Sequence, residues 1–134
     1  MALQDTIDYV TISTTGNATD FGDLLSPIQR LTGTSDATRG VVGGGLASTN
    51  VIQYITIAST GNATDFGDLL GTGYHNFSAT SNSLRGVFTG GRSGTENVLQ
   101  YITIQSLGNS IDFGDLTYSA YNVGSTSNGT GGLN

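Results

Sequence analysis

Short apolar runs alternate with clusters of glycine, asparagine, serine and threonine along the whole chain. The run at residues 7–12, Ile-Asp-Tyr-Val-Thr-Ile, returns in closely similar form at 52–57 and at 99–104, after 45 and then 47 residues. Runs rich in β-branched and aromatic residues between turn-forming residues predict β-strands. A sustained apolar period of 3.6 residues occurs nowhere, which predicts almost no helix.

A second block of sequence follows each of these runs. It reads Thr-Gly-Asn-Ala-Thr-Asp-Phe-Gly-Asp-Leu-Leu at residues 15–25, recurs letter for letter at 60–70, and returns more loosely at 107–116. Gly-Asn pairs tolerate positive φ and mark a turn. The Phe-Gly-Asp-Leu that comes after the turn predicts a second short strand in each copy.

A third block supplies two more strand candidates. An Arg-Gly-Val sequence begins at Arg39 and again at Arg85, ends in a diglycine, and is preceded by weaker strand candidates at residues 31–38 and 77–84. We therefore expect four short strands per repeat, joined by tight turns at the diglycines.

The chain is expected to be one repeat domain, residues 1–134. Repeat 1 covers residues 7–51, repeat 2 covers 52–98, and repeat 3, which is incomplete, covers 99–134. Where the third copy of the Arg-Gly-Val block would place its arginine, Gly131 stands.

The order of these marks resembles the kelch repeat, in which a diglycine, a tyrosine, an aromatic residue and a leucine follow one another. The residues that carry this resemblance are Gly43 and Gly44, Gly90 and Gly91, Tyr54 and Tyr101, Phe66 and Phe113, and Leu69 and Leu116. The two phenylalanines take the place of the kelch tryptophan. The resemblance implies an all-β fold, a β-propeller of four-stranded blades with about three blades per chain. A β-solenoid is the alternative, although 46 residues is long for one rung.

Three blades are too few for a closed propeller, which needs about four to eight. An open array exposes strand edges at both ends. We therefore expect the ring to be completed by oligomerisation, with two identical chains making six blades. If the rotation does not close, the same contacts produce a filament.

Composition narrows the function classes. Charged residues make up only 10% of the chain, the net charge is −6, and lysine is absent. A nucleic-acid binder needs a basic footprint, so no nucleic-acid partner is expected. No apolar run approaches the length that membrane insertion requires, and no signal peptide is visible. We predict a non-enzymatic protein without a cofactor.

The amino-acid sequence of the repeat also resembles repeats in virion and tail-associated proteins of marine and cyanobacterial phages. This resemblance implies a structural or binding component of a virion or another extracellular assembly. Two alternatives stay open: a lectin-like propeller that binds glycans, and a designed or excised propeller fragment.

Pairs of aspartates are the first candidate site. They are Asp20 and Asp23, Asp65 and Asp68, and Asp112 and Asp115. We expect one member of a pair to cap its turn through its own backbone. The other would form a structural pair with Arg39 or Arg85 of a neighbouring blade. No metal site is predicted, although clustered oxygens leave calcium as an alternative.

The segments that differ most between the copies are the second candidate site. They lie at residues 25–31, 70–77 and 117–122, and their aromatic and imidazole side chains are Tyr74, His75, Tyr118 and Tyr121. A varying segment on a constant scaffold predicts a contact surface. Flat aromatic faces suit a cell-surface glycan or another virion protein. His75 has no marked nucleophile as a partner, so no catalytic residue is proposed.

Overall fold

The computed structural model describes residues 2–46, 49–91 and 96–129. Within these residues the chain forms ten strands and no helix, so the all-β prediction is confirmed. The strands are β1 Thr6–Tyr9, β2 Thr19–Asp23, β3 Thr32–Ser35, β4 Arg39–Gly43, β5 Val51–Thr56, β6 Thr64–Asp68, β7 Ser78–Ser81, β8 Arg85–Thr89, β9 Val98–Thr103 and β10 Ile111–Asp115. The predicted end of repeat 3, from residue 130 onward, lies outside the described residues.

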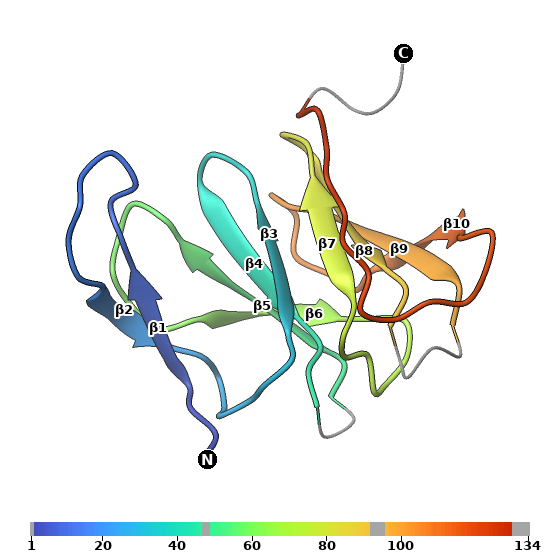
Figure 1. Ribbon diagram of the computed structural model, residues 1–134, viewed down its shortest axis with the longest axis horizontal. Coiled ribbons are helices and arrows are strands. Elements are labelled where there is room, and N and C mark those ends of the chain that lie inside the picture. The colour runs from blue at the N-terminus through green and yellow to red at the C-terminus, as the bar shows by residue number, and fades with distance from the viewer. Residues whose placement is uncertain (1, 47–48, 92–95, 130–134) are drawn as a thin grey trace.

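The strands form three antiparallel sheets in which neighbours in the sequence are neighbours in space. The sheets are the pair β1–β2, the four-stranded sheet β3–β6 and the four-stranded sheet β7–β10. Figure 1 shows them one after another in chain order, from the blue pair to the yellow and orange sheet. The four strands predicted for one repeat are therefore confirmed in the two four-stranded sheets, each of which begins at the weakest predicted strand.

The two complete sheets have the same register. Arg39 is opposite Thr56 in one and Arg85 is opposite Thr103 in the other. Every last hairpin contains a bulge at the same place, because its phenylalanine is skipped in the pairing of the two strands. These phenylalanines are Phe21, Phe66 and Phe113.

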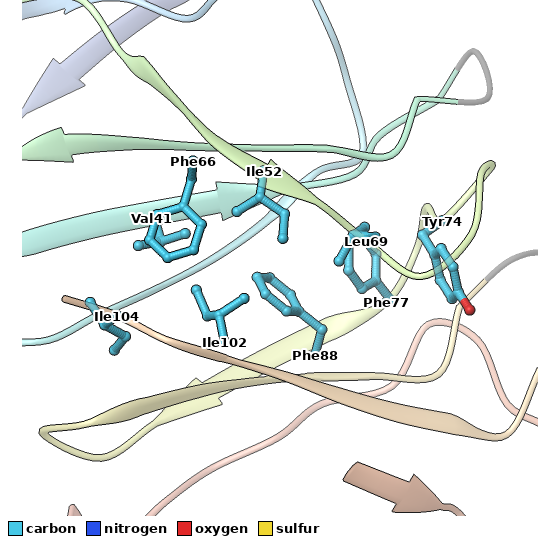
Figure 2. Close-up of a cluster of buried hydrophobic side chains, with 9 residues drawn as sticks. All are labelled: Val41, Ile52, Phe66, Leu69, Tyr74, Phe77, Phe88, Ile102 and Ile104. Atoms are coloured by element: carbon cyan, nitrogen blue, oxygen red, sulfur yellow. The ribbon is translucent and has the colours of Figure 1, made fainter. Parts of the chain in front are cut away.

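The principal core lies between the two four-stranded sheets. Figure 2 shows its buried side chains, which are Val41, Ile52, Phe66, Leu69, Tyr74, Phe77, Phe88, Ile102 and Ile104. Phe88 projects from β8 towards Gly43 of β4, where an added Cβ would approach its ring to 3.2 Å. The missing side chain at Gly43 thus leaves space for the fully buried Phe88 of the facing sheet.

The sheets approach each other most closely at their first strands. Of the strand pairs that belong to different sheets, β3 and β7 make the most extensive contact. Beyond β7, the segment after Asn122 continues the series: its Ser125 hydroxyl is 2.6 Å from that of Ser78, and the Asn122 N–H donates to the Asn76 carbonyl (2.6 Å). The first strands thus lie side by side, and the remaining strands extend away from them (Figure 1).

No helix in the described part of the chain is long and apolar enough to cross a membrane.

Candidate assembly interface

The first two sheets are joined by the loop between β5 and β6, which lies along β2. The Gly61 N–H donates to the Phe21 carbonyl and the Ala63 N–H to the Asp23 carbonyl, both at 2.8 Å. In return, the Asp23 N–H donates to the Asn62 Oδ1 (3.0 Å). The turn of this hairpin lies before the predicted Gly-Asn pair, where the Ser59 N–H donates to the Thr56 carbonyl (3.1 Å). Asn62 instead links one sheet to the next.

The junction between the second and third sheets repeats these contacts. The Gly108 N–H donates to the Phe66 carbonyl (2.9 Å), the Ser110 N–H to the Asp68 carbonyl (2.8 Å), and the Asp68 N–H to Asn109 Oδ1 (3.0 Å). The backbone pattern and the distances agree with the first junction, with Ser110 in the place of Ala63. The repeat therefore encodes the contact between sheets as well as the sheet itself.

A buried glutamine completes each junction. Gln53 Oε1 accepts from the Leu25 N–H (2.8 Å), and Gln100 Oε1 accepts from the Leu70 N–H (2.9 Å). Both glutamines are buried, and the Ser110 hydroxyl also donates to Gln100 (2.6 Å). A buried amide is favourable only when it is hydrogen-bonded in this way.

A glycine in β6 makes the close approach of the loop possible. Gly67 has φ +149°, and a Cβ placed on it would overlap the backbone carbonyl of Gly108. The equivalent glycine of β10, Gly114, has φ +141° and no atom of another element within 4 Å of such a Cβ. β10 therefore has the glycine that such a loop requires, and within the described residues no loop lies against it.

The exposure of the phenylalanine in each bulge depends on whether a following sheet covers it. In all three hairpins it packs edge-on against a tyrosine, with ring centroids 5.9–6.0 Å apart: Tyr9 with Phe21, Tyr54 with Phe66, and Tyr101 with Phe113. Phe21 and Phe66 are 7% and 3% exposed, whereas Phe113 is 51% exposed. The pair itself is constant, so the difference comes from the sheet that packs on it.

The opposite end of the chain has a matching apolar surface. Ile104, which follows β9, is fully buried against the preceding four-stranded sheet, whereas its equivalent in repeat 1, Ile12, is 96% exposed. Ile57 is preceded by a sheet of only two strands, β1 and β2, and its exposure is intermediate between those of Ile104 and Ile12. One face at each end of the described chain is thus unpaired and apolar.

An apolar groove lies between β1 and the strands β3 and β4. Its lining includes Ile7, Leu24, Gly40, Val42, Ile55 and Ala63. In the next sheet the place equivalent to Gly40 is filled, since a Cβ on Gly86 would lie 2.8 Å from Thr34 Cγ2 of the preceding sheet. A Cβ on Gly40 would meet only Ile55 of its own sheet, at 3.2 Å.

The two arginines predicted to pair with aspartates contact aromatic rings. Arg39 lies over the ring of Tyr54 and Arg85 over that of Tyr101, each 4.6 Å from the centroid. Arg39 Nη1 also donates to the carbonyl of Ile104 (2.9 Å). Among the described residues the contacts of these two arginines are with tyrosine rings and, for Arg39, a backbone carbonyl of the next repeat, and the expected Arg–Asp pairs stay a prediction.

The six aspartates line the outer hairpins and are exposed, except for the half-buried Asp68. These are Asp20, Asp23, Asp65, Asp68, Asp112 and Asp115. Asp23 and Asp68 join the junctions through backbone groups, as described above. Within the described residues no three His, Cys, Asp or Glu side chains gather to hold a metal ion.

The described residues place a turn-capping carboxylate at Asp36 instead, which the sequence analysis did not select. Its Oδ1 accepts from the backbone N–H groups of Thr38 and Arg39, both at 2.8 Å. Its Oδ2 accepts from Nε2 of Gln105, which lies in the turn that follows β9 of the next sheet (2.5 Å). Although partial burial acts to raise it, the bonds from Gln105, Arg39 and Thr38 lower the pKa of Asp36 from 3.8 to about 2.

The variable segments supply two exposed aromatic side chains, not three. Tyr118 and Tyr121 are exposed, but Tyr74 is buried in the principal core, 6.1 Å from the ring of Phe77. Tyr74 therefore packs the fold and does not belong to a contact surface. The ring of His75 is half-buried, and its Nδ1 lies 2.8 Å from the Gly73 carbonyl. Glycan binding through the two remaining tyrosines stays a prediction.

No model of a known protein family matches the sequence, and no curated protein is significantly similar to it.

Proposed function

We propose that this chain is a non-enzymatic β-propeller module that assembles with copies of itself. Each four-stranded sheet would be one blade, and two chains would make a six-bladed ring. The module would serve as a rigid structural or binding part of a larger particle.

The arrangement of the sheets supports the blade assignment. Successive four-stranded antiparallel sheets pack face to face, with their first strands closest together and the later strands diverging. Sheets arranged in this way about a common axis form a propeller. Sheets stacked along a straight axis would instead keep equivalent strands equally spaced.

The exposure of Phe113 is the single observation that carries self-assembly. The same bulge residue is buried wherever another sheet follows and half exposed on β10. Because the opposite end presents the free loop and the apolar face that cover Phe21 and Phe66 elsewhere, a second copy supplies what this surface lacks. Covering about half of a phenylalanine side chain contributes on the order of 1 kcal/mol.

The setting proposed for the module is a phage virion or tail, or another extracellular assembly. This part of the proposal rests on the resemblance of the repeat sequence to repeats in phage particle proteins. A low charge content and many Ser, Thr and Asn residues are compatible with an exterior module.

Sedimentation equilibrium on the purified chain over a wide concentration range tests the proposal. We expect a species of twice the 13.7 kDa chain mass that dissociates on dilution. A ladder of larger species would mean that the same contacts propagate without closing, as a filament. A folded chain that stays monomeric at every concentration would contradict self-assembly.

A further inference from the structure

We propose that the loop at residues 14–18 of one copy docks on β10 of a second copy, and that Asp8 makes this joint weaker than the junctions within the chain. The inference rests on the proposed self-assembly and adds its contact surface and the residue that sets its strength. The occupant is a second copy, because the chain twice displays the finished form of this contact.

Both halves of the contact are present in repeat 1 and repeat 3. Gly16, Asn17 and Ala18 repeat the loop residues that bridge the internal junctions, and Phe113 and Asp115 repeat the receiving ones. By equivalence, the Gly16 N–H would donate to the Phe113 carbonyl and the Ala18 N–H to the Asp115 carbonyl. The Asp115 N–H would donate to Asn17 Oδ1.

Both halves are also free in the described chain. The loop residues 16–18 are exposed, and so are Phe113 and Asp115. A Cβ on Gly114 would have open space around it, while one on Gly67 would overlap the docked loop. β10 therefore has, at Gly114, the glycine that a docking loop needs, although nothing in the described chain docks there.

A residue of the second copy would also fill the apolar groove beside β3 and β4. Threonine recurs every 46 residues at Thr34, Thr80 and Thr126. Thr34 covers Gly86 in the internal junction, and Thr126 lies exposed on the segment that follows β7 in space. In the assembly Thr126 of the second copy would cover Gly40 in the same way.

Asp8 is the hydrogen-bonding side chain of the joint that departs from the internal pattern. It occupies the position of Gln53 and Gln100, the buried acceptors of the Leu25 and Leu70 N–H groups. Its side chain is one methylene shorter than glutamine and carries a charge whose burial is unfavourable. The equivalent donor on the second copy, the Thr117 N–H, would therefore receive a poorer partner than either internal leucine amide.

Sedimentation equilibrium on the wild type and two variants tests the strength of the joint. Gly114→Ala, whose Cβ would overlap the docked loop, should raise the dissociation constant at least about tenfold, the equivalent of one lost hydrogen bond. Asp8→Gln, which restores the internal residue, should lower it by about tenfold. An unchanged constant in both variants, with a wild type that still assembles, would overturn this joint and leave self-assembly standing.

Cysteine cross-linking tests the location of the joint independently of affinity. The chain has no native cysteine, so Asn17→Cys combined with Asp115→Cys should give a disulfide-linked dimer under oxidising conditions. The matched control, Asn62→Cys with Asp23→Cys, places the same pair at an internal junction and should cross-link within one chain. Internal cross-linking without any interchain product, in a wild type that forms dimers, would show that the copies meet elsewhere. A wild type that is monomeric throughout would instead refute the self-assembly on which the joint depends.

Discussion

Asp36 connects two levels of the structure through one carboxylate. One oxygen closes the turn between β3 and β4, and the other accepts from Gln105 of the following sheet. Asn82 occupies the equivalent turn and accepts from the N–H groups of Leu84 and Arg85 at 2.9 and 2.8 Å. A neutral amide is therefore sufficient to cap the turn, whereas the second oxygen of the charged Asp36 carboxylate adds a contact to the following repeat.

This charge predicts a pH dependence of stability. The folded pKa of Asp36 is about 2, below its ordinary 3.8, so the native state favours the ionised form. Its contribution is complete above about pH 4 and is lost as the pH falls from 3.8 through about 2. Asp36→Asn keeps the turn bonds, so the stability difference between wild type and variant should shrink across this range in urea unfolding at several pH values.

A second variant separates the charge from the cap. Asp36→Ala removes both, and should cost about 1 kcal/mol even at pH 3 because the turn N–H groups lose their acceptor. If the Asp36→Asn difference were the same at pH 7 and pH 2.5, the carboxylate would not be ionised preferentially in the fold.

At the scale of elements, most of what sequence could predict concerns the strands themselves. Runs of β-branched and aromatic residues such as 52–57 can be predicted as strands from the sequence alone, because strand propensity and turn residues act locally. The bulge at each phenylalanine and the junction asparagines could not be derived in this way. Asn62 follows a glycine, which predicts a turn, but its side chain bonds to Asp23 of the preceding sheet, and only tertiary structure reveals that role.

Sequence variation also proved a poor guide to exposure. Residues 70–77 differ between the copies, yet Tyr74 and Phe77 are part of the principal core. Repeat 3 has Ala120 where repeat 2 has Tyr74, and the Gly91 N–H bonds to its carbonyl as the Gly45 N–H does to that of Tyr74. The backbone contact is constant and the side chain is free to fill whatever space its own junction leaves.

The buried glutamines give a prediction that belongs to this scale. Gln100→Leu leaves the Leu70 N–H and the Ser110 hydroxyl without their acceptor in a buried junction. We expect a loss of about 2 kcal/mol in the free energy of unfolding, within the range for unsatisfied buried groups. The exposed Gln4→Leu is the matched control and should change stability by less than about 0.5 kcal/mol. Equal effects of the two substitutions would mean that Gln100 contributes through its volume alone.

The whole molecule is an array in which each sheet is completed by contacts with its neighbours. Stability in such arrays comes from the repeats and from the interfaces between them. The end faces are therefore not ordinary surface: Ile12 and Phe113 lie at the positions where Ile104 and Phe66 are buried. A contact that closes these faces adds an interface of the kind that already holds the chain together.

Amide hydrogen exchange follows this closure residue by residue. The N–H groups of Asp23 and Asp68 bond to Asn62 and Asn109 inside every chain, so their exchange should be slow and independent of protein concentration. In the proposed joint the equivalent N–H of Asp115 would gain its acceptor from a second copy, so its exchange should slow as the concentration rises through the dissociation constant. NMR exchange measurements at a dilute and a concentrated sample check this difference.

Two asparagine variants turn this measurement into a matched pair. Asn109→Ala removes the acceptor of the Asp68 N–H, so that amide should exchange faster at every concentration while Asp115 keeps its concentration dependence. Asn17→Ala should leave the exchange of the Asp68 N–H slow and remove the concentration dependence at Asp115, because it removes only the acceptor that a second copy offers. If exchange at Asp115 stayed constant over a range in which the mass doubles, the copies would associate without using β10. The equivalence between the internal junctions and the contact between chains would then fail, however well the sheets themselves repeat.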